Sequence, residues 1–515
     1  MKRTILSATA MAVATAFALP AFAEKSMSAD IAIIGGGLSG LAAGVQAIQG
    51  GAKVIVLEKQ AKVGGTGNLC EGFFAAESKL QKRIGINVSK DAAFKMIMEY
   101  SHWKANGALA KAFVDKSAQT LDWMEALGIK YEYVGVGGFG GPLTWHVVAP
   151  GPDYPDKDPK DFHCARVINV FNKFILNNGG TILTKTPGTG LITEGNKVVG
   201  VKAKSEDGED IKIAAKAVVV ATGGFANNKE MIRKYAPEFA DVIPVGNIGK
   251  EGDGIRMSEA AGASLEGMPV MQLYRPGLPG FHPADQMIAA AVQPYFWVAP
   301  NAQRYTDESN VEFWPSSGNS LARVGGVAYS IYDDATRKHV VEDGIEMPLG
   351  EWVLQGTKLT KWEESFNKEL ARKRGFVFKA NSLDDLAKQI GIDPVMLKAS
   401  VERMNKAVAN RVDDEFNKNP KFLRPIATPP FYATKLLPRM LGTLGGVRVT
   451  AKAEAVDAKG VTIPGLYAVG TDAGGLYGDT YDLLLGGSTA GFAVNTGRIA
   501  AENALIYAGI AKAKK

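Results

Sequence analysis

The sequence predicts an α/β protein in which one domain is interrupted by a second, smaller domain of mixed α+β character. Three observations support this. A strand, a glycine-rich turn and a helix lie near the N-terminus, and similar glycine-rich segments return near the C-terminus. Between them, about 160 residues have a different composition. The chain of 515 residues is also longer than one hydrophobic core usually supports. The first and last segments are therefore expected to form one Rossmann-like domain.

The strongest local signal is the turn Gly35-Gly36-Gly37-Leu38-Ser39-Gly40, which follows an apolar strand and has the pattern G-x-G-x-x-G. Gly35 allows the tight turn, Gly37 lets backbone N–H groups approach a pyrophosphate, and Gly40 lets helix and strand pack closely. Glu58 ends the next apolar strand, where its carboxylate can accept from ribose hydroxyls. The spacing predicts a dinucleotide site. The alternative is a glycine-rich turn without a ligand.

Other loops are expected to approach the same ligand. They are the glycine-rich loop after Glu58, the end of the strand 218–220, the Gly-Asp-Gly turn that opens a helix at 255–261, the loop 471–475, and the start of the last helix at 489–504. The dipole of that last helix favours negative charge on a polarised carbonyl. Candidate contacts in these loops are Lys59, Gly64, Gly65, Thr66, Thr222, Gly223, Asp253, Thr471, Asp472, Gly487 and Ser488.

The middle of the chain predicts an inserted domain. From about residue 270 aromatic residues and prolines increase, and charged helices are expected at 361–374, 383–390 and 394–410. We therefore expect a dinucleotide-binding domain in two parts, 24–270 and 436–515, and a capping domain (the cap) at 271–435.

Before the cap, residues 90–128 predict helices, whereas 133–165 predict a long irregular loop. His146 lies in that loop, where it either faces a substrate or belongs to the core. The chain has two cysteines, Cys70 and Cys164, which allow at most one disulfide. No C-x-x-C-H pattern and no metal-ligand spacing is present, so neither covalent haem nor a metal site is expected.

Residues 1–23 predict a secretory signal peptide. They begin with Lys2-Arg3, continue with the short apolar stretch 5–19 and end in Ala21-Phe22-Ala23. The stretch is shorter than the roughly 20 residues that span a membrane. We expect Sec export, a periplasmic mature protein and no membrane span. The formal charge of +6 falls to 6 − 2 = +4 without this segment, and no basic stripe predicts a nucleic-acid partner.

With these motifs in order, nearly the whole mature chain resembles the flavoprotein family of soluble fumarate reductases (flavocytochrome c flavin domains), succinate dehydrogenase flavoproteins, urocanate reductases and 3-ketosteroid dehydrogenases. The shared segments are GGGLSGLAAG, EKQAKVGGTGN, VVVATGGFANN, KEGDGIRMSEAAGA, AQRYTDES, GTLGGV and GLYAVGTDAGGLYG. The resemblance implies a Rossmann-like FAD-binding domain interrupted by a capping domain. It places non-covalent FAD contacts on Ser39, Glu58, Thr66, Gly72, Asp253 and Ser488, and implies hydride transfer at a carbon next to an activating carbonyl.

The chain departs from fumarate reductases where they bind substrate. Their Q-x-H-P-T is QLYRP at 272–276, their M-x-T-E-A-V-R is MIAAAVQ at 287–293, and their H-H-T-M-G-G is LGTLGG at 441–446. Their proton-donating arginine is matched by Glu312, and their carboxylate-binding arginine by Tyr481. A dianion needs bidentate guanidinium partners, so fumarate is not the expected substrate.

Four residues are candidate catalytic groups. Tyr481 is similar to the tyrosine of H-T-Y in ketosteroid dehydrogenases, which hydrogen-bonds the ketone; the alternative is a tyrosine packed under its loop. Arg275 either pairs with a carboxylate or holds the cap by a salt bridge. Glu312 is either a proton donor, if burial raises its pKa, or a surface residue. Tyr274 takes the position of the family's histidine.

These observations predict a periplasmic FAD-dependent reductase of an activated C=C bond. Its substrate is expected to be a small unsaturated carbonyl compound or carboxylate. Because the chain has no haem motif, its electrons are expected from a separate c-type cytochrome or a quinol-linked partner. Two alternatives remain open: a dehydrogenase that inserts a C=C bond beside a ketone, and a flavin electron carrier, for which a cap of this size has no evident use.

Overall fold

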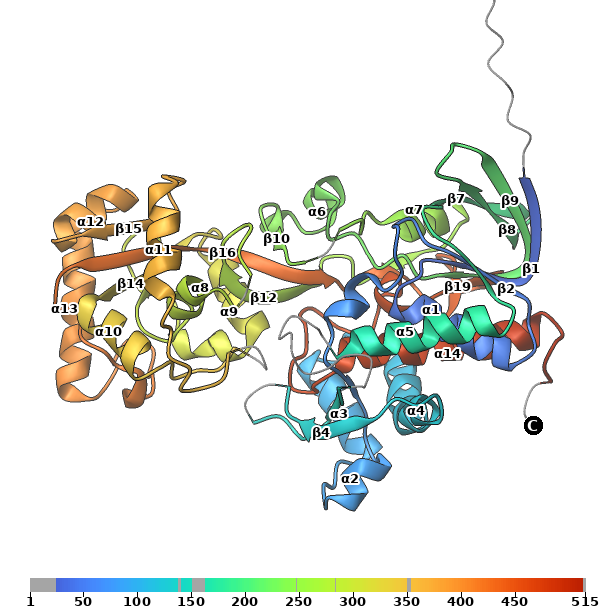
Figure 1. Cartoon of the computed structure of the whole chain (residues 1–515), viewed down its shortest axis with the longest axis horizontal. Coiled ribbons are helices and arrows are strands. Elements are labelled where there is room, and N and C mark those ends of the chain that lie inside the picture. The colour runs from blue at the N-terminus through green and yellow to red at the C-terminus, as the bar shows by residue number, and fades with distance from the viewer. Residues whose placement is uncertain are drawn as a thin grey trace, which may run out of the picture.

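The chain folds into two packed bodies joined by one long strand, as the computed structural model shows (Figure 1). The structure describes residues 25–137, 140–150, 163–246, 248–282, 284–349 and 353–512. The predicted signal peptide, 1–23, lies outside the described residues. Helices and strands alternate around a mainly parallel sheet, which confirms the predicted α/β class.

The larger sheet forms the centre of the first body. Its parallel strands lie in the order β19 (Thr462–Ala468), β9 (Asp210–Val220), β1 (Lys25–Ile34), β2 (Val54–Leu57) and β6 (Thr181–Leu183). The antiparallel strands β7 (Gly188–Glu194) and β8 (Lys197–Lys204) extend it from the first half of β9, and β18 (Glu454–Val456) pairs with β19. The predicted apolar strand at 31–34 is the buried end of β1. The first residues of β1 are less buried and pair with β9.

Three helices pack together on this sheet: α1 (Leu38–Gln49), α5 (Cys164–Asn177) and α14 (Ser488–Tyr507) (Figure 1). The helices predicted within 90–128 are α3 (Lys90–Tyr100) and α4 (Gly107–Ala126). The other elements of this body include α2 (Lys79–Arg83), α6 (Lys229–Tyr235), α7 (Asp253–Ala260), β11 (Leu265–Glu266) and β17 (Gly446–Val447), whereas β10 (Ile243–Pro244) joins the sheet of the second body.

The prediction of a long irregular loop at 133–165 is wrong in part. Two of its segments are strands, β4 (Tyr131–Gly135) and β5 (Trp145–Val148), which form a small antiparallel sheet with β3 (Gly72–Phe74). His146 is fully buried in β5, and its Nε2 lies 2.7 Å from Ser78 Oγ. Burial lowers the pKa of His146 to about 4, so it is a neutral core histidine.

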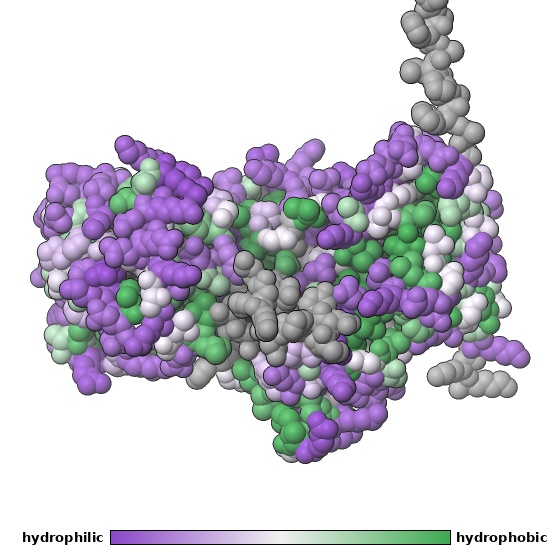
Figure 2. Space-filling model, in the orientation of Figure 1, coloured by the Kyte–Doolittle hydropathy of each residue, from purple (hydrophilic) through white to green (hydrophobic). Residues whose placement is uncertain are grey.

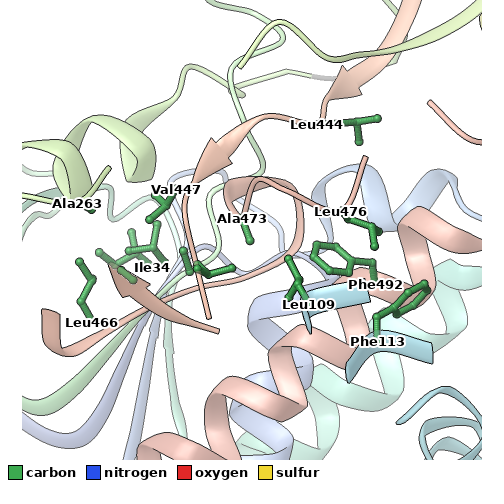
Figure 3. Packing of buried hydrophobic residues seen from close by; sticks show 14 of the residues in the cluster. Ile34, Leu109, Phe113, Ala263, Leu444, Val447, Leu466, Ala473, Leu476 and Phe492 are labelled. Carbon is green, nitrogen blue, oxygen red and sulfur yellow. The ribbon is translucent and has the colours of Figure 1, made fainter. Parts of the chain in front are cut away.

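A large apolar cluster joins the sheet, α4, α14 and the C-terminal loops. Figure 3 shows residues of this cluster, with Ile34 and Leu466 from the sheet at the left and Phe113 from α4 and Phe492 from α14 at the right. The same cluster includes Tyr477 and Tyr481 at its edge. The packing therefore fixes the loop before α14 against the sheet.

The second body contains the cap. Its helices are α8 (Gln286–Ala291), α9 (Trp314–Arg323), α10 (Asp334–Glu342), α11 (Trp362–Ala371), α12 (Leu383–Ile390) and α13 (Pro394–Asn410), and its strands are β12 (Met271–Gly277), β13 (Trp297–Val298), β14 (Ala328–Asp333), β15 (Val377–Ala380) and β16 (Phe431–Thr443). The three predicted charged helices are confirmed as α11, α12 and α13, and they present a mostly hydrophilic surface at the left of Figure 2.

One strand connects the two bodies. β16 pairs with β14 and β15 at its first residues, and with β12 and β10 at its last ones (Figure 1). The expected domain boundary at 435/436 lies inside this strand, and the division of the chain into domains stays a prediction.

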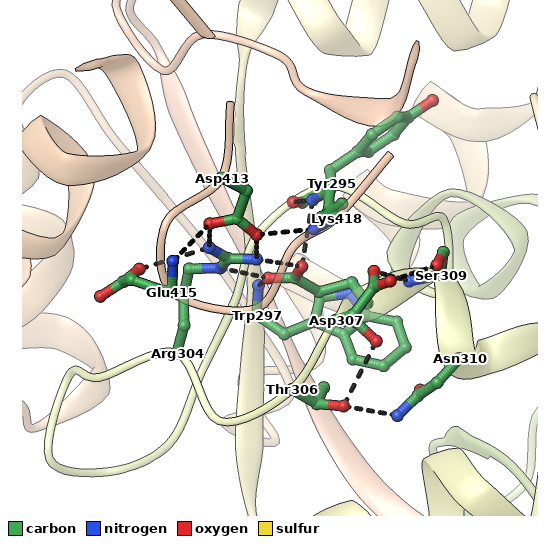
Figure 4. A network of polar contacts seen from close by, with 11 residues as sticks. Tyr295, Trp297, Arg304, Thr306, Asp307, Ser309, Asn310, Asp413, Glu415 and Lys418 are labelled. Atoms are coloured by element: carbon green, nitrogen blue, oxygen red, sulfur yellow. Dashed lines mark hydrogen bonds and ion pairs between the residues drawn. The ribbon is translucent and has the colours of Figure 1, made fainter. Parts of the chain in front are cut away.

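A buried ion network lies in the cap (Figure 4). Arg304 donates to Glu308 at 2.8 and 2.9 Å and to Asp413 at 2.7 and 2.9 Å. Lys418 Nζ lies 3.0 Å from Glu308 Oε2 and also donates to the backbone oxygen of Tyr295. The sequence segment AQRYTDES thus supplies a structural core to the cap.

Among the described residues, no helix combines the length and the apolar character that a membrane span needs. The same residues contain no cluster of three or more His, Cys, Asp or Glu side chains arranged to hold a metal ion.

Candidate cofactor and substrate site

The first glycine-rich turn leaves open space at the start of α1. Gly35 has φ +110°, and a Cβ there would lie 2.2 Å from Ala221 O. A Cβ on Gly40 would lie 1.9 Å from Gly35 O, whereas Gly37 has only Gly64 O, at 4.0 Å, near it. No side chain caps α1, so its first N–H groups are available to an anion. This geometry fits a pyrophosphate group.

Acidic and basic side chains gather at the end of β2. The buried Glu58 accepts hydrogen bonds from the N–H groups of Gly36, at 2.9 Å, and Gln60, at 2.7 Å. Lys59 and Asp253 are brought together from distant parts of the chain in an ion pair of 2.6 Å. Asp253 also pairs with Arg256 at 2.7 Å. The predicted contacts Glu58, Lys59 and Asp253 therefore lie on neighbouring loops.

The loop after β2 carries several predicted contacts. Gly64 and Gly65 have positive φ, and Thr66 lies half-buried in the short 3₁₀ turn that they begin. A Cβ on Gly72 would lie 2.3 Å from His146 O, which explains why glycine is needed where β3 meets β5. Both cysteines of the chain are free thiols here, and Cys164 N–H donates to Cys70 O at 3.1 Å.

The loops after β9 and β19 hold each other. Asp472 accepts hydrogen bonds from Thr222 Oγ1 and Gly224 N–H, both at 2.8 Å, and from Thr222 N–H. Gly223, with φ +93°, lies in the turn that Asp472 holds, and Thr471 is half-buried beside Asp472. Asp472 is thus a support of this turn, with its carboxylate oxygens occupied by protein donors.

The start of α14 is surrounded by hydroxyl groups. Gly487 has φ +77°, and a Cβ there would lie 2.5 Å from Phe73 C. No side chain caps the helix. Tyr477 OH lies 3.0 Å from Ser488 Oγ and 2.9 Å from Thr489 Oγ1, so these donors converge at the positive end of the helix dipole.

Tyr481 joins this hydroxyl group. It is buried, its ring centroid lies 5.5 Å from that of Tyr477, and its hydroxyl group lies near Thr489 and Gln272. Burial raises the pKa of its phenol, which stays neutral and can donate a hydrogen bond. Ser39, another predicted contact, is buried near Gly470, at the other end of the same loop.

Asp482 is a residue that sequence reasoning missed. Its Oδ1 accepts from Leu484 N–H at 2.7 Å, and its Oδ2 has no partner among the described residues. Burial raises its pKa to about 6. Beside it lies a cavity of about 10 Å³, lined in part by Tyr100 and Tyr477, which has room for about one water molecule.

A second polar group lies on β12 and β16, where the two bodies meet. The strand register places Tyr274 opposite Arg439, and the ring of Tyr274 lies 4.7 Å from that of Trp314. Arg275 donates to Tyr274 OH at 3.3 Å. Glu312 is half-buried near Arg275. Burial raises the pKa of Glu312, and this effect is larger than the lowering caused by the positive charge of Arg275. The predicted residues Tyr274, Arg275 and Glu312 are therefore neighbours.

Two contacts connect this group to the start of α14. Gln272 Nε2 donates to Thr489 Oγ1 at 3.3 Å. Asn319 of α9 donates to Thr480 Oγ1, next to Tyr481, at 3.0 Å. The cap therefore lies against the Tyr481 loop.

Lys250 was also missed by sequence reasoning. It is buried against Gly223 and Gly442, and its Nζ lies 3.4 Å from Leu441 O. Burial lowers its pKa to about 8. In the sequence, nothing distinguishes Lys250 or Asp482 from surface residues. Arg439 differs from them, because an arginine inside an apolar strand is a sequence signal of a buried charge.

Comparison with known proteins decides the family. A family model described as "FAD binding domain" matches residues 30–488. This chain belongs to the FAD-binding-domain family. A vinyl phenol reductase of Lactiplantibacillus plantarum is 34% identical over 94% of this chain and 97% of its own. A cytochrome-type fumarate reductase of Shewanella frigidimarina is 29% identical over 93% of this chain and 77% of its own.

Solved structures share the fold. A 3-ketosteroid Δ1-dehydrogenase from Sterolibacterium denitrificans superposes with a TM-score of 0.74, at 21% identity, over 93% of this chain and 99% of its own. The expected family is confirmed, and the chain is an FAD-dependent oxidoreductase. The open space at Gly37 and the starts of α1 and α14, which no side chain caps, fit FAD.

Proposed function

We propose that this protein is an FAD-dependent reductase of an activated C=C bond in a small carbonyl compound or carboxylate other than fumarate. The supporting observation is that neutral donors surround Tyr481. In the sequence, Tyr481 takes the position of the carboxylate-binding arginine of fumarate reductases. Reductases of unsaturated compounds are also among the chain's similar proteins, including one named for vinyl phenol.

FAD binds non-covalently in this proposal. Gly35, Gly37, Ser39 and Gly40 at the start of α1 would hold its pyrophosphate, and Glu58 would accept from the ribose. Gly487 and Ser488 at the start of α14 would hold a flavin carbonyl, where the helix dipole favours negative charge. The remaining predicted contacts are Lys59, Gly64, Gly65, Thr66, Gly72, Thr222, Gly223, Asp253, Thr471 and Asp472.

Reduced FAD supplies the hydride that the β-carbon of the C=C bond receives. The residues of this chain bind the carbonyl during this transfer and then return one proton to the α-carbon, which completes the CH–CH product. Tyr481 donates a hydrogen bond to the oxygen on which negative charge develops. Glu312, Arg275 and Tyr274 lie together and form the second candidate group for handling the carbonyl and the proton.

The electrons come from a separate c-type cytochrome or a quinol-linked partner in this proposal, since the sequence contains no haem motif. The predicted signal peptide at residues 1–23 supports a periplasmic location. A periplasmic flavoenzyme of this family is expected to act in the reductive direction.

The test is anaerobic reoxidation of dithionite-reduced, FAD-loaded protein by fumarate, acrylate, cinnamate, urocanate, 4-vinylphenol and an unsaturated ketone. We expect rapid reoxidation by at least one of the carbonyl compounds or carboxylates other than fumarate; reoxidation by 4-vinylphenol alone would contradict the proposed substrate class. Tyr481→Phe should slow it about 100-fold, the loss of one oxyanion donor, without loss of bound FAD. Fast reoxidation by fumarate would contradict the assignment at Tyr481.

A dehydrogenase acting beside a ketone is the second candidate, because Tyr481 is positioned to hydrogen-bond a neutral ketone. In that case none of the alkenes reoxidises the flavin, and a saturated ketone reduces the oxidised flavin instead. The direction of flavin change therefore separates the two functions.

A further inference from the structure

Two buried guanidinium groups lie beside each other without a carboxylate. Arg275 and Arg439 are 6% and 2% exposed. Among the described residues, neither has an ion pair within 4.0 Å, and Arg439 makes no side-chain hydrogen bond. Arg275 makes one side-chain hydrogen bond, to Tyr274 OH, and its Nε has no hydrogen-bond partner among the described residues.

The two cations share one aromatic neighbour, Tyr274. The Cζ atom of Arg439 lies 5.5 Å from the centroid of the Tyr274 ring, and that of Arg275 lies 5.6 Å from it. Arg275 also lies 4.7 Å from the centroid of Trp314. Their positive charges repel each other, and burial lowers the pKa of both.

The aromatic contacts do not compensate for this burial. A cation–π contact is weaker than the cost of removing a guanidinium from water, and two like charges add to that cost. Nearby acids act only at longer range: Glu71 and Glu312 influence Arg275, but neither lies within ion-pair distance of it. An anion in contact with both guanidiniums removes the repulsion and satisfies the free N–H groups.

FAD is not that anion. Arg275 and Arg439 lie on β12 and β16, and none of the residues that contact them belongs to the first strand–turn–helix unit, where the pyrophosphate fits. In contrast, Gln272, two residues before Tyr274, contacts Thr489 beside Tyr481. The arginine pair therefore lies on the substrate side of the site.

We propose that Arg275 and Arg439 together bind the carboxylate of the substrate, which makes it an enoate with one carboxylate group. This inference rests on the proposed reductase function. At the opposite end of the site, Tyr477, Tyr481, Thr489 and Gln272 offer neutral donors. The ammonium group of Lys250 lies close to Gln272, since a Cβ on Gly442 would be 3.3 Å from Lys250 Nζ and 3.5 Å from Gln272 Oε1. No guanidinium lies among these groups, so a second carboxylate lacks the bidentate partner that fumarate needs.

The experiment measures binding without turnover. Oxidised, FAD-loaded protein is titrated calorimetrically with two saturated probes, propanoate and 3-phenylpropanoate, and with their methyl esters. At least one acid should bind 10-fold or more tightly than its ester. Arg275→Gln and Arg439→Gln should each weaken binding of that acid by 10- to 100-fold, because a charge-assisted contact is lost.

Arg323→Gln is the matched control. Arg323 is exposed on α9, so the same change of charge there should leave binding unchanged. Retention of bound FAD, followed by its absorbance, verifies that each variant is folded.

The outcomes separate this inference from the proposed function. Equal affinity for acid and ester, binding of neither acid, or unchanged affinity in both arginine variants overturns the inference. If the acid binds through the arginines but no alkene reoxidises the reduced flavin, the anion site stands and the reductase function fails. If the unsaturated ketone reoxidises the flavin and the arginine variants react as fast as wild type, the reductase function stands and the inference fails.

Discussion

Two regions of the molecule bury arginine side chains in opposite ways. Arg304 in the cap contacts Glu308 and Asp413 through four hydrogen bonds, and its neighbour Lys418 is paired with the same glutamate (Figure 4). Arg275 and Arg439 have no such partner among the described residues. The carboxylates hold the pKa of Arg304 above its usual value, whereas burial lowers the pKa of the other two.

The difference indicates what each arginine is for. A buried charge whose partners all come from the same chain completes a core, and breaking it leaves the partners unpaired. A buried charge without a partner lowers stability, so its presence indicates recognition of something outside the chain. On this basis Arg304 is structural, and Arg275 and Arg439 are recognition residues.

The largest expected effect is at the paired network. Glu308→Gln should destabilise the cap by about 3–5 kcal/mol, because Arg304 and Lys418 lose the charge between them. Urea unfolding of the FAD-loaded protein measures this. Asp384→Asn is the control: it removes an exposed pair with Lys398, with side chains 45% and 51% exposed, and should cost no more than about 1 kcal/mol. If both variants lost a similar free energy of unfolding, the Arg304 network would not be a structural core of the cap.

A buried acid sharpens the comparison. Asp482 has no cation partner among the described residues, and burial raises its pKa from 3.8 to about 6. The folded state therefore keeps its proton at pH values where the unfolded state has lost it. Stability from this group is complete below about pH 3.8, and is lost as pH rises to about 6, in total on the order of 3 kcal/mol.

Asp482→Asn should remove this part of the pH dependence. The unfolding midpoint in urea, measured from pH 4 to pH 6.5, should fall less steeply with rising pH in the variant than in wild type. Identical slopes would mean that the carboxyl group is paired or hydrated in solution.

Much of the fold was predictable from the sequence. The turn at residues 35–40 and the charged helices α11, α12 and α13 follow local rules of glycine spacing and periodicity. The strands β4 and β5 were missed because each is only four or five residues long and pairs across a glycine-rich stretch. Their partner, β3, is contributed by the loop after β2, which no local pattern indicates.

The site was predictable only in part. Tyr274, Arg275 and Glu312 were recognised by their positions in family motifs, and they do lie together. Arg439 was missed because its neighbour Tyr274 is far away in the chain and becomes adjacent only through the register of β12 and β16. Lys250 and Asp482 are likewise defined by their burial, which a sequence does not display.

The most direct test of the recognition role is the unfolding midpoint of Arg439→Met with and without 3-phenylpropanoate, compared with wild type. Without the probe, the variant should be as stable as wild type or more so, because an unpaired buried charge is removed and a side chain of similar length fills its place. With the probe at 100 times its dissociation constant for wild type, wild type should gain about 2.7 kcal/mol and the variant much less. A variant that is several kcal/mol less stable than wild type, yet gains as much from the probe, would show that Arg439 supports the fold and does not recognise a carboxylate.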